Sequence, residues 1–223
     1  SNQHFNIELD TNSVPRYSCA AHKLNLAVRS GIKKSKKFSY ILAKLSKFAS
    51  EIRRSNIKSL SFIENKAKLR CENGTRWSSS YLMLESFLKA YEKKAFSDEK
   101  AFEKQDKPCP VSQRTILSYL KILNPLYTLS LLTQKADWHI GDVIQGLIFI
   151  FDSLDESTEL GEKKQLILNL KNEIRIRFKF ILESKIYILA ATFNVSKLNF
   201  LYGSEDFNEL SDKAVNETPF FFY

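Results

Sequence analysis

The sequence predicts a mainly helical fold, and three observations lead to this prediction. The 223 residues include only six Gly and five Pro, well below the roughly 12% that these two residues together contribute to an average soluble protein. Few turns are therefore available, which disfavours an all-β or low-complexity chain. Hydrophobic residues make up 43% of the chain, which is enough for a core. Apolar residues also recur at helical spacing through most of the sequence.

The first predicted helix begins at Ala20 and ends near Gly31, and the residues Arg16–Cys19 before it are predicted as a short strand. The most regular helix follows, because seven apolar residues fit the i, i+3, i+4, i+7 pattern with no misses. These residues are Phe38, Ile41, Leu42, Leu45, Phe48, Ala49 and Ile52. Ser35 occupies the position of an N-cap. The opposite face of this helix is basic, so one helix is both core-facing and basic.

Further helices are predicted along the rest of the chain. They cover residues 57–69, a stretch that starts near residues 78–80, a stretch that Ser112 opens, residues 140–154 and residues 163–193. Asn73-Gly74 predicts a turn, and residues 97–110 predict a long loop because they are charged and contain two prolines. Pro125 predicts a kink or break. The helical pattern over residues 163–193 allows a break near Ser184. Trp138 is interpreted as a packing residue.

Positive charge is concentrated in the first half of the chain. The formal net charge is +9, and residues 16–76 contain 16 Lys or Arg against three Asp or Glu. Charge of one sign on this scale attracts a polyanion, most commonly nucleic acid and less often a membrane surface or an acidic protein. The alternative is a solvated lysine-rich surface. The cations expected to contact DNA are Lys33, Lys34, Lys36, Lys37, Arg53 and Arg54.

The residues that could carry chemistry are few, and none is assigned a catalytic role. The sequence has neither a glycine-rich phosphate loop nor a Gly-x-Ser-x-Gly nucleophile motif. Cys19 and His22 have the spacing of half a zinc site, but Cys71, Cys109 and His139 are singly spaced. A buried cysteine and a hydrogen-bonded histidine are the leading interpretation, so no metal ligand is assigned.

Trp77 is the other residue of interest, because it follows the Asn-Gly turn and adjoins Arg76. An exposed Trp can stack on an unpaired base, and an Arg can hold a phosphate. Residue type alone favours an ordinary core tryptophan.

Three scattered cysteines do not predict a disulfide framework, so a reducing compartment is expected. The chain shows no signal peptide and no apolar stretch of the roughly 18–20 residues that a membrane span needs. No membrane association is therefore expected.

Three stretches resemble the hAT (hobo, Activator, Tam) transposases and their domesticated relatives. Residues 16–26 are similar to the family's Cys-x-x-His-x-Leu-Asn-Leu segment through Cys19 and His22. Residues 75–84 are similar to its Thr-Arg-Trp-Asn-Ser-Thr-Tyr-x-Met-Leu segment through Thr75, Arg76 and Trp77. Residues 188–201 look like a degraded Leu-Asp-Pro-Arg segment.

The resemblance implies a ribonuclease H-like catalytic core that a long helical insertion interrupts. It divides the chain into an edge of that core (1–19), the helical insertion domain (20–203) and an acidic, aromatic tail (204–223). The catalytic carboxylates, and the Mg²⁺ that they would bind, are expected outside this chain, so the chain alone is not expected to cut DNA. By the same resemblance, Trp77 stacks near the hairpin at the cleaved DNA end, and His22 lies near the scissile phosphate.

The function expected from the resemblance and the charge is DNA binding by the helical portion of a hAT-type transposase, or of a protein derived from one. Transposon ends are the expected DNA, the nucleus is the expected location, and any self-association is expected through regions outside this chain. The alternative is a domesticated module that binds protein partners and has lost DNA contact. If Trp77 stacks on a base, it should be at least partly exposed and within reach of His22.

Overall fold

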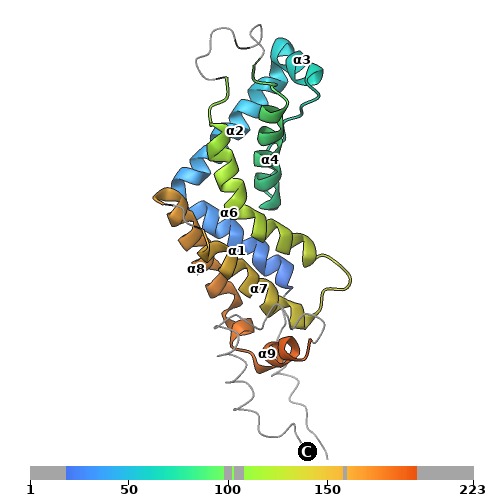
Figure 1. The fold of residues 1–223 in the computed structure, drawn as a ribbon, viewed down its shortest axis with the longest axis vertical. Helices are drawn as coiled ribbons and strands as arrows, with labels where there is room; N and C mark the ends of the chain where they lie inside the picture. The colour runs from blue at the N-terminus through green and yellow to red at the C-terminus, as the bar shows by residue number, and fades with distance from the viewer. Residues whose placement is uncertain (1–18, 98–101, 103–107, 158–159, 195–223) are drawn as a thin grey trace, which may run out of the picture.

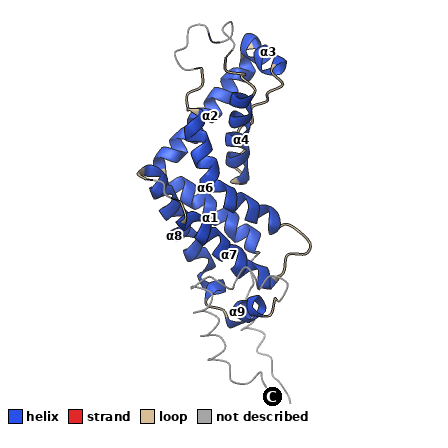
Figure 2. Cartoon of the chain, viewed as in Figure 1, coloured by secondary structure: helices blue, strands red, loops and turns tan. Residues whose placement is uncertain are grey.

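The computed structural model describes residues 19–97, 102, 108–157 and 160–194, and 75% of these residues are helical. No strand occurs among them (Figure 2). The prediction of a mainly helical fold is therefore confirmed. Of the strand predicted over Arg16–Cys19, only Cys19 lies in the described part, where it is the non-helical residue before the first helix.

Eight helices lie in the described residues and form an elongated bundle (Figure 1). They are α1 (Ala20–Lys34), α2 (Lys36–Arg54), α3 (Asn56–Glu64), α4 (Ser78–Glu92), α6 (Gln113–Leu132), α7 (Ile140–Asp155), α8 (Glu162–Leu182) and α9 (Lys185–Thr192). The most extensive pairings are α1 with α8, α7 with α9 and α4 with α6. Helices α2, α3 and α4 lie toward one end of the bundle, and α7, α8 and α9 lie toward the other (Figure 1).

Helix α2 forms as its apolar pattern predicts, because all seven predicted core residues are buried. Ser35 precedes the helix as expected, but its hydroxyl donates to the carbonyl of Gly31 at 2.8 Å and accepts from the amide of Asn169 at 2.9 Å. The residue therefore joins α1, α2 and α8. Ser112 acts as the predicted N-cap of α6, since its Oγ accepts from the backbone N–H of Thr115.

Aromatic side chains fill the core at the α2–α4 end. The Phe96 ring lies 4.6 Å from Tyr91, 5.4 Å from Phe62 and 6.2 Å from Phe48, measured between ring centroids. Offset and edge contacts of this kind stabilise a core beyond the area that they bury. They fix the C-terminal ends of α3 and α4 against α2.

Two residues after the last residue of α3, and again after that of α4, a lysine adopts the left-handed conformation that usually selects glycine. Lys66 has φ +50° and Lys94 has φ +56°. After each, the next N–H closes the helix end, from Ala67 to Phe62 at 2.8 Å and from Ala95 to Ala90 at 3.0 Å. A cation at this position interacts favourably with the negative end of the helix dipole.

Two predicted boundaries are wrong. Helix α1 does not stop at Gly31 but continues to Lys34. The glycine is there for packing, because a Cβ at this position would collide with Leu170 of α8. Helix α3 ends at Glu64 rather than Leu69, and a turn and a segment outside any helix follow. Of the two outcomes predicted at Pro125, a kink or a break, the break does not occur: helix α6 continues through Pro125 and bends along its length (Figure 1).

Other predictions hold within the described residues. Asn73-Gly74 forms a turn with Gly74 at φ +66°, and the chain breaks at Ser184 between α8 and α9. Trp138 packs against the core as expected. None of the described helices is long and apolar enough to cross a membrane.

A buried carboxylate lies between α1 and α8. The Glu173 side chain is 5% exposed, and its Oε1 lies 2.5 Å from the Lys34 ammonium. Its Oε2 lies 3.7 Å from Nε of Arg177. The hydrogen bond from Lys34 is the main reason that the pKa of Glu173 lies below its ordinary value of 4.5, and burial opposes this shift.

We expect Glu173→Gln to lower the free energy of unfolding at neutral pH by about 1–3 kcal/mol, because a charge-assisted hydrogen bond is lost. The folded-state pKa is lowered, so the unfolded chain binds more protons just below pH 4.5, and this stability is lost as pH falls. Urea unfolding at several pH values should show wild type and variant converging under acid conditions. Glu183→Gln, in an exposed pair with Lys179, is the control and should have little effect. A Glu173→Gln loss that does not change with pH would contradict the assignment.

Candidate functional site

A hydrogen bond between a side chain and the backbone joins the two motif segments. The side-chain oxygen of Asn25 in α1 accepts from the backbone N–H of Trp77 at 3.2 Å, across 52 residues of sequence. Just before Trp77, Gly74 supplies the left-handed turn, and Ser79 Oγ bonds the carbonyl of Arg76 at 2.8 Å. The first segment therefore positions the second at the start of α4. Asn25 was not among the residues expected to form the site.

Trp77 is buried, with only 3% of its surface exposed. Its indole Nε1–H donates to Ser130 Oγ of α6 at 3.2 Å, and its ring makes an edge contact with Tyr127 at 6.3 Å between centroids. Tyr127 in turn stacks on Tyr81 at 4.1 Å. The expectation of a partly exposed Trp77 is wrong, because two residues of α6 cover the ring.

Burial also weighs against base stacking by Trp77. Removing a Trp from a core costs about 3–5 kcal/mol, whereas stacking on a base contributes about 1–3 kcal/mol. The indole would have to leave its pocket and its bond to Ser130 before it could stack. In this conformation Trp77 therefore organises the walls of the neighbouring clefts and does not itself present a stacking face.

A cleft of about 420 Å³ lies between the start of α1, the turn before α4 and the second half of α6, and we call it the His22 cleft. Its lining includes His22, Asn25, Arg76, Trp77, Tyr127 and Ser130. His22 and Arg76 are both exposed, so one imidazole and one guanidinium are available to a ligand. The structure thus brings together three of the nine residues that were expected near DNA, although Trp77 contributes a wall and not a free face.

A second cleft, of about 620 Å³, lies between α1, α2, α8 and the turn before α4, and Trp77 and Arg76 border both clefts. We call it the Arg29 cleft. Its cationic side chains are Arg29, Lys33, Arg76 and Arg177, and Glu72 is its one acidic side chain. A concave surface lined by charges of one sign concentrates the electric field and attracts anions.

Two cations of the Arg29 cleft were missed from the sequence. Arg29 lies one helical turn before Lys33, so the i, i+4 spacing could have placed it on the same face. Its guanidinium also reaches the carbonyl of Thr75 at 3.5 Å. Arg177 had no local signal, because α8 brings it to α1 from the far end of the sequence.

The other basic residues expected to contact DNA have different surroundings. Lys34 and Lys37 are paired with Glu173 and Glu162 of α8. Arg53 donates to the carbonyl of Leu69 at 3.2 Å and so supports the chain after α3. The remaining three of the six cations expected to contact DNA are exposed. These three are Lys33, Lys36 and Arg54.

The charged groups of the two clefts are of a kind that binds phosphates. Across the described ranges, no three His, Cys, Asp or Glu side chains gather closely enough to hold a metal ion. Guanidinium, ammonium and imidazole groups can position phosphates by charge and hydrogen bonds.

Residues 17–116 match the family model described as the ZBED1 RNase-like helical domain, a domain of the hAT-derived, transposase-like family. The matched residues contain both motif segments and run from just before α1 into the start of α6. No curated protein matches the chain. The matched part of the chain is therefore similar to a transposase-derived helical domain.

Proposed function

We propose that this chain is the DNA-binding helical portion of a hAT-type transposase, or of a protein derived from one. In this proposal the helices form the insertion domain of a ribonuclease H-like enzyme, and the Mg²⁺-binding carboxylates lie outside the chain. Transposon ends are the DNA and the nucleus is the location. The observation that carries the proposal is the convergence of the two motif segments on clefts lined by cations.

The proposed role of the chain is to hold DNA and not to cut it. Arg29, Lys33 and Arg76 supply positive charge at one cleft, and His22 lies at the adjoining one. Contacts of this type fix the position of a strand but read little sequence. Binding by the isolated chain is therefore expected to be largely independent of DNA sequence.

We expect the chain to bind a short DNA duplex with an affinity that falls steeply with salt. Each neutralised phosphate contributes a slope of about −0.9 in log K against log salt. Lys33→Gln with Lys36→Gln should weaken binding and make this slope shallower, and fluorescence anisotropy across a salt series measures both. Neither side chain is in the ion pairs described above, so the fold should tolerate the change.

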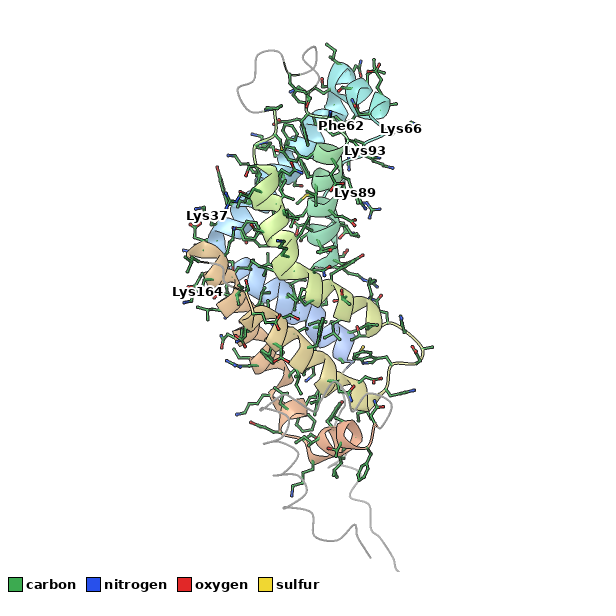
Figure 3. All side chains as sticks on the ribbon, in the orientation of Figure 1. Lys37, Phe62, Lys66, Lys89, Lys93 and Lys164 are labelled. Atoms are coloured by element: carbon green, nitrogen blue, oxygen red, sulfur yellow. The ribbon has the colours of Figure 1, made fainter. Side chains whose placement is uncertain are left out.

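The control for this experiment needs lysines away from the basic block. Lys164 is unsuitable, because α8 begins beside Lys37, which pairs with Glu162 (Figure 3). Lys121→Gln with Lys179→Gln removes the same charge from α6 and from the end of α8. If this control weakens binding as much as the test pair does, only net charge matters. Failure of the wild type to bind DNA at low salt would refute the proposed function.

A protein-interaction module is the second candidate, and an exposed apolar row on α3 favours it. Ile57, Leu60 and Ile63 are 65%, 55% and 69% exposed and recur every three residues. A row of this kind is typical of a surface that packs against another protein. The DNA-binding measurement described above separates the two candidates, because a protein-interaction module does not need a salt-dependent affinity for DNA.

A further inference from the structure

A third concave region lies between the segment that follows α3 and the second half of α4. Its volume is about 200 Å³, and we call it the lysine cleft. Five of its lining side chains are cationic and one is acidic: Lys66, Lys68, Arg70, Lys89, Lys93 and Glu85. None of the five cations belongs to the two clefts beside Trp77.

The segment that carries the first three cations is held by hydrogen bonds along its backbone. The carbonyl of Leu69 accepts from Arg53 at 3.2 Å, and the N–H of Arg70 donates to Ser86 Oγ at 3.0 Å. The carbonyl of Lys66 accepts from the Lys93 ammonium. The segment is therefore fixed to both α2 and α4, although it belongs to no helix or strand.

Its side chains alternate between the core and the solvent. Leu69 is buried, whereas Lys66, Lys68 and Arg70 are exposed. Lys66 has a left-handed φ of +50°, so the three cations follow a turn and an irregular segment. Three cations are therefore exposed to solvent on a segment whose backbone is already held by hydrogen bonds.

Helix α4 adds two more cations one helical turn apart. Lys89 and Lys93 lie on the same face, because residues i and i+4 of a helix are neighbours. Glu85 pairs with Lys89 at 3.0 Å and is the one acidic side chain in the lining. Figure 3 shows Lys66, Lys93 and Lys89 along the same side of the molecule.

We propose that the lysine cleft binds consecutive phosphates of a nucleic-acid strand. The observation that carries this proposal is the exposure of Lys66, Lys68 and Arg70 on a segment held by hydrogen bonds, beside a second row of cations on α4. It rests on the proposed function and adds a contact surface to it that the motif segments do not contain. Like charges gathered in one concavity repel one another, and an anion relieves that repulsion.

The test compares two double variants that remove equal charge from the same basic block. Lys68→Gln with Arg70→Gln should lower the affinity for a short DNA duplex by about tenfold. It should also make the slope of log K against log salt shallower by nearly two, because two phosphate contacts are lost. Lys44→Gln with Lys47→Gln, on the exposed face of α2 outside the cleft, should change the affinity by no more than about threefold.

A third variant separates charge from packing. Lys68→Arg with Arg70→Lys keeps both cations and should retain most of the affinity, and the thermal midpoints of all three variants show whether each one folds. Equal losses from the two Gln pairs, with DNA binding intact in the wild type, would overturn the lysine cleft but leave the proposed function standing.

Inorganic pyrophosphate is the second probe. If wild type binds pyrophosphate but no duplex, both the nucleic-acid assignment and the proposed function are wrong.

Discussion

Replacing Trp77 by alanine is expected to lower the free energy of unfolding by about 3–5 kcal/mol, because a large buried ring is deleted. For a chain of this size, each kcal/mol moves the thermal midpoint by roughly 2–4 °C. Thermal unfolding followed by circular dichroism measures the change. The expected loss reflects the two contacts of the ring with α6, the hydrogen bond that its Nε1–H donates to Ser130 and the edge contact with Tyr127.

Two further variants make this expectation specific. Trp77→Phe keeps an aromatic ring but removes the donor to Ser130, so it should lose only about 1–2 kcal/mol and should bind duplex DNA as wild type does. Ile57→Ala shortens a side chain that is 65% exposed and should change stability by no more than about 0.5 kcal/mol. An unchanged thermal midpoint for Trp77→Ala, together with lost affinity for hairpin DNA, would restore a stacking role.

Replacing Gly31 by leucine is the second change with a large expected effect. A Cβ at this position would lie 2.9 Å from Cδ2 and 3.1 Å from Cα of Leu170. The side-chain atom could move, but the backbone atom could move only if α1 and α8 separated. Overpacking of this kind costs about 1–3 kcal/mol, with the larger side chain toward the upper limit.

Gly31→Ala should cost less, because replacing glycine inside a helix gains about 1 kcal/mol of helix propensity. Asn172→Leu adds a leucine to the exposed side of α8 and should stay within about 0.5 kcal/mol of wild type. Urea unfolding of the three variants gives the ranking. A Gly31→Leu chain as stable as wild type would mean that α1 and α8 are not in close contact at this point.

The periodicity of α2 was sufficient to predict its whole buried face, because each of the seven apolar residues contacts a core that lies on one side of the helix. The start of α6 was equally predictable, since the hydroxyl of Ser112 satisfies a nearby backbone N–H. Both results depend on interactions within a few residues of sequence. Patterns of this length carry most of the information needed to assign helices.

Contacts between distant residues explain the errors. Glycine is typical of a helix end, but Gly31 is needed because Leu170, far along the chain, leaves no room for a Cβ. Trp77 follows a turn in a basic segment, but its burial depends on Tyr127 and Ser130 of α6. Arg177 reaches the Arg29 cleft only because α8 packs on α1. No local pattern in a single sequence contains these pairings.

The pairing of α1 with α8 has a consequence for synthesis on the ribosome. The side chain of Lys23 in α1 bonds the carbonyl of Arg177, 154 residues later. At about 5–20 residues per second, α1 would wait several seconds or more for its principal partner to emerge. During that time the apolar face formed by Leu24, Ala27 and Val28 has no native cover from α8. Nascent chains of this protein therefore offer chaperones a binding stretch close to the start of α1.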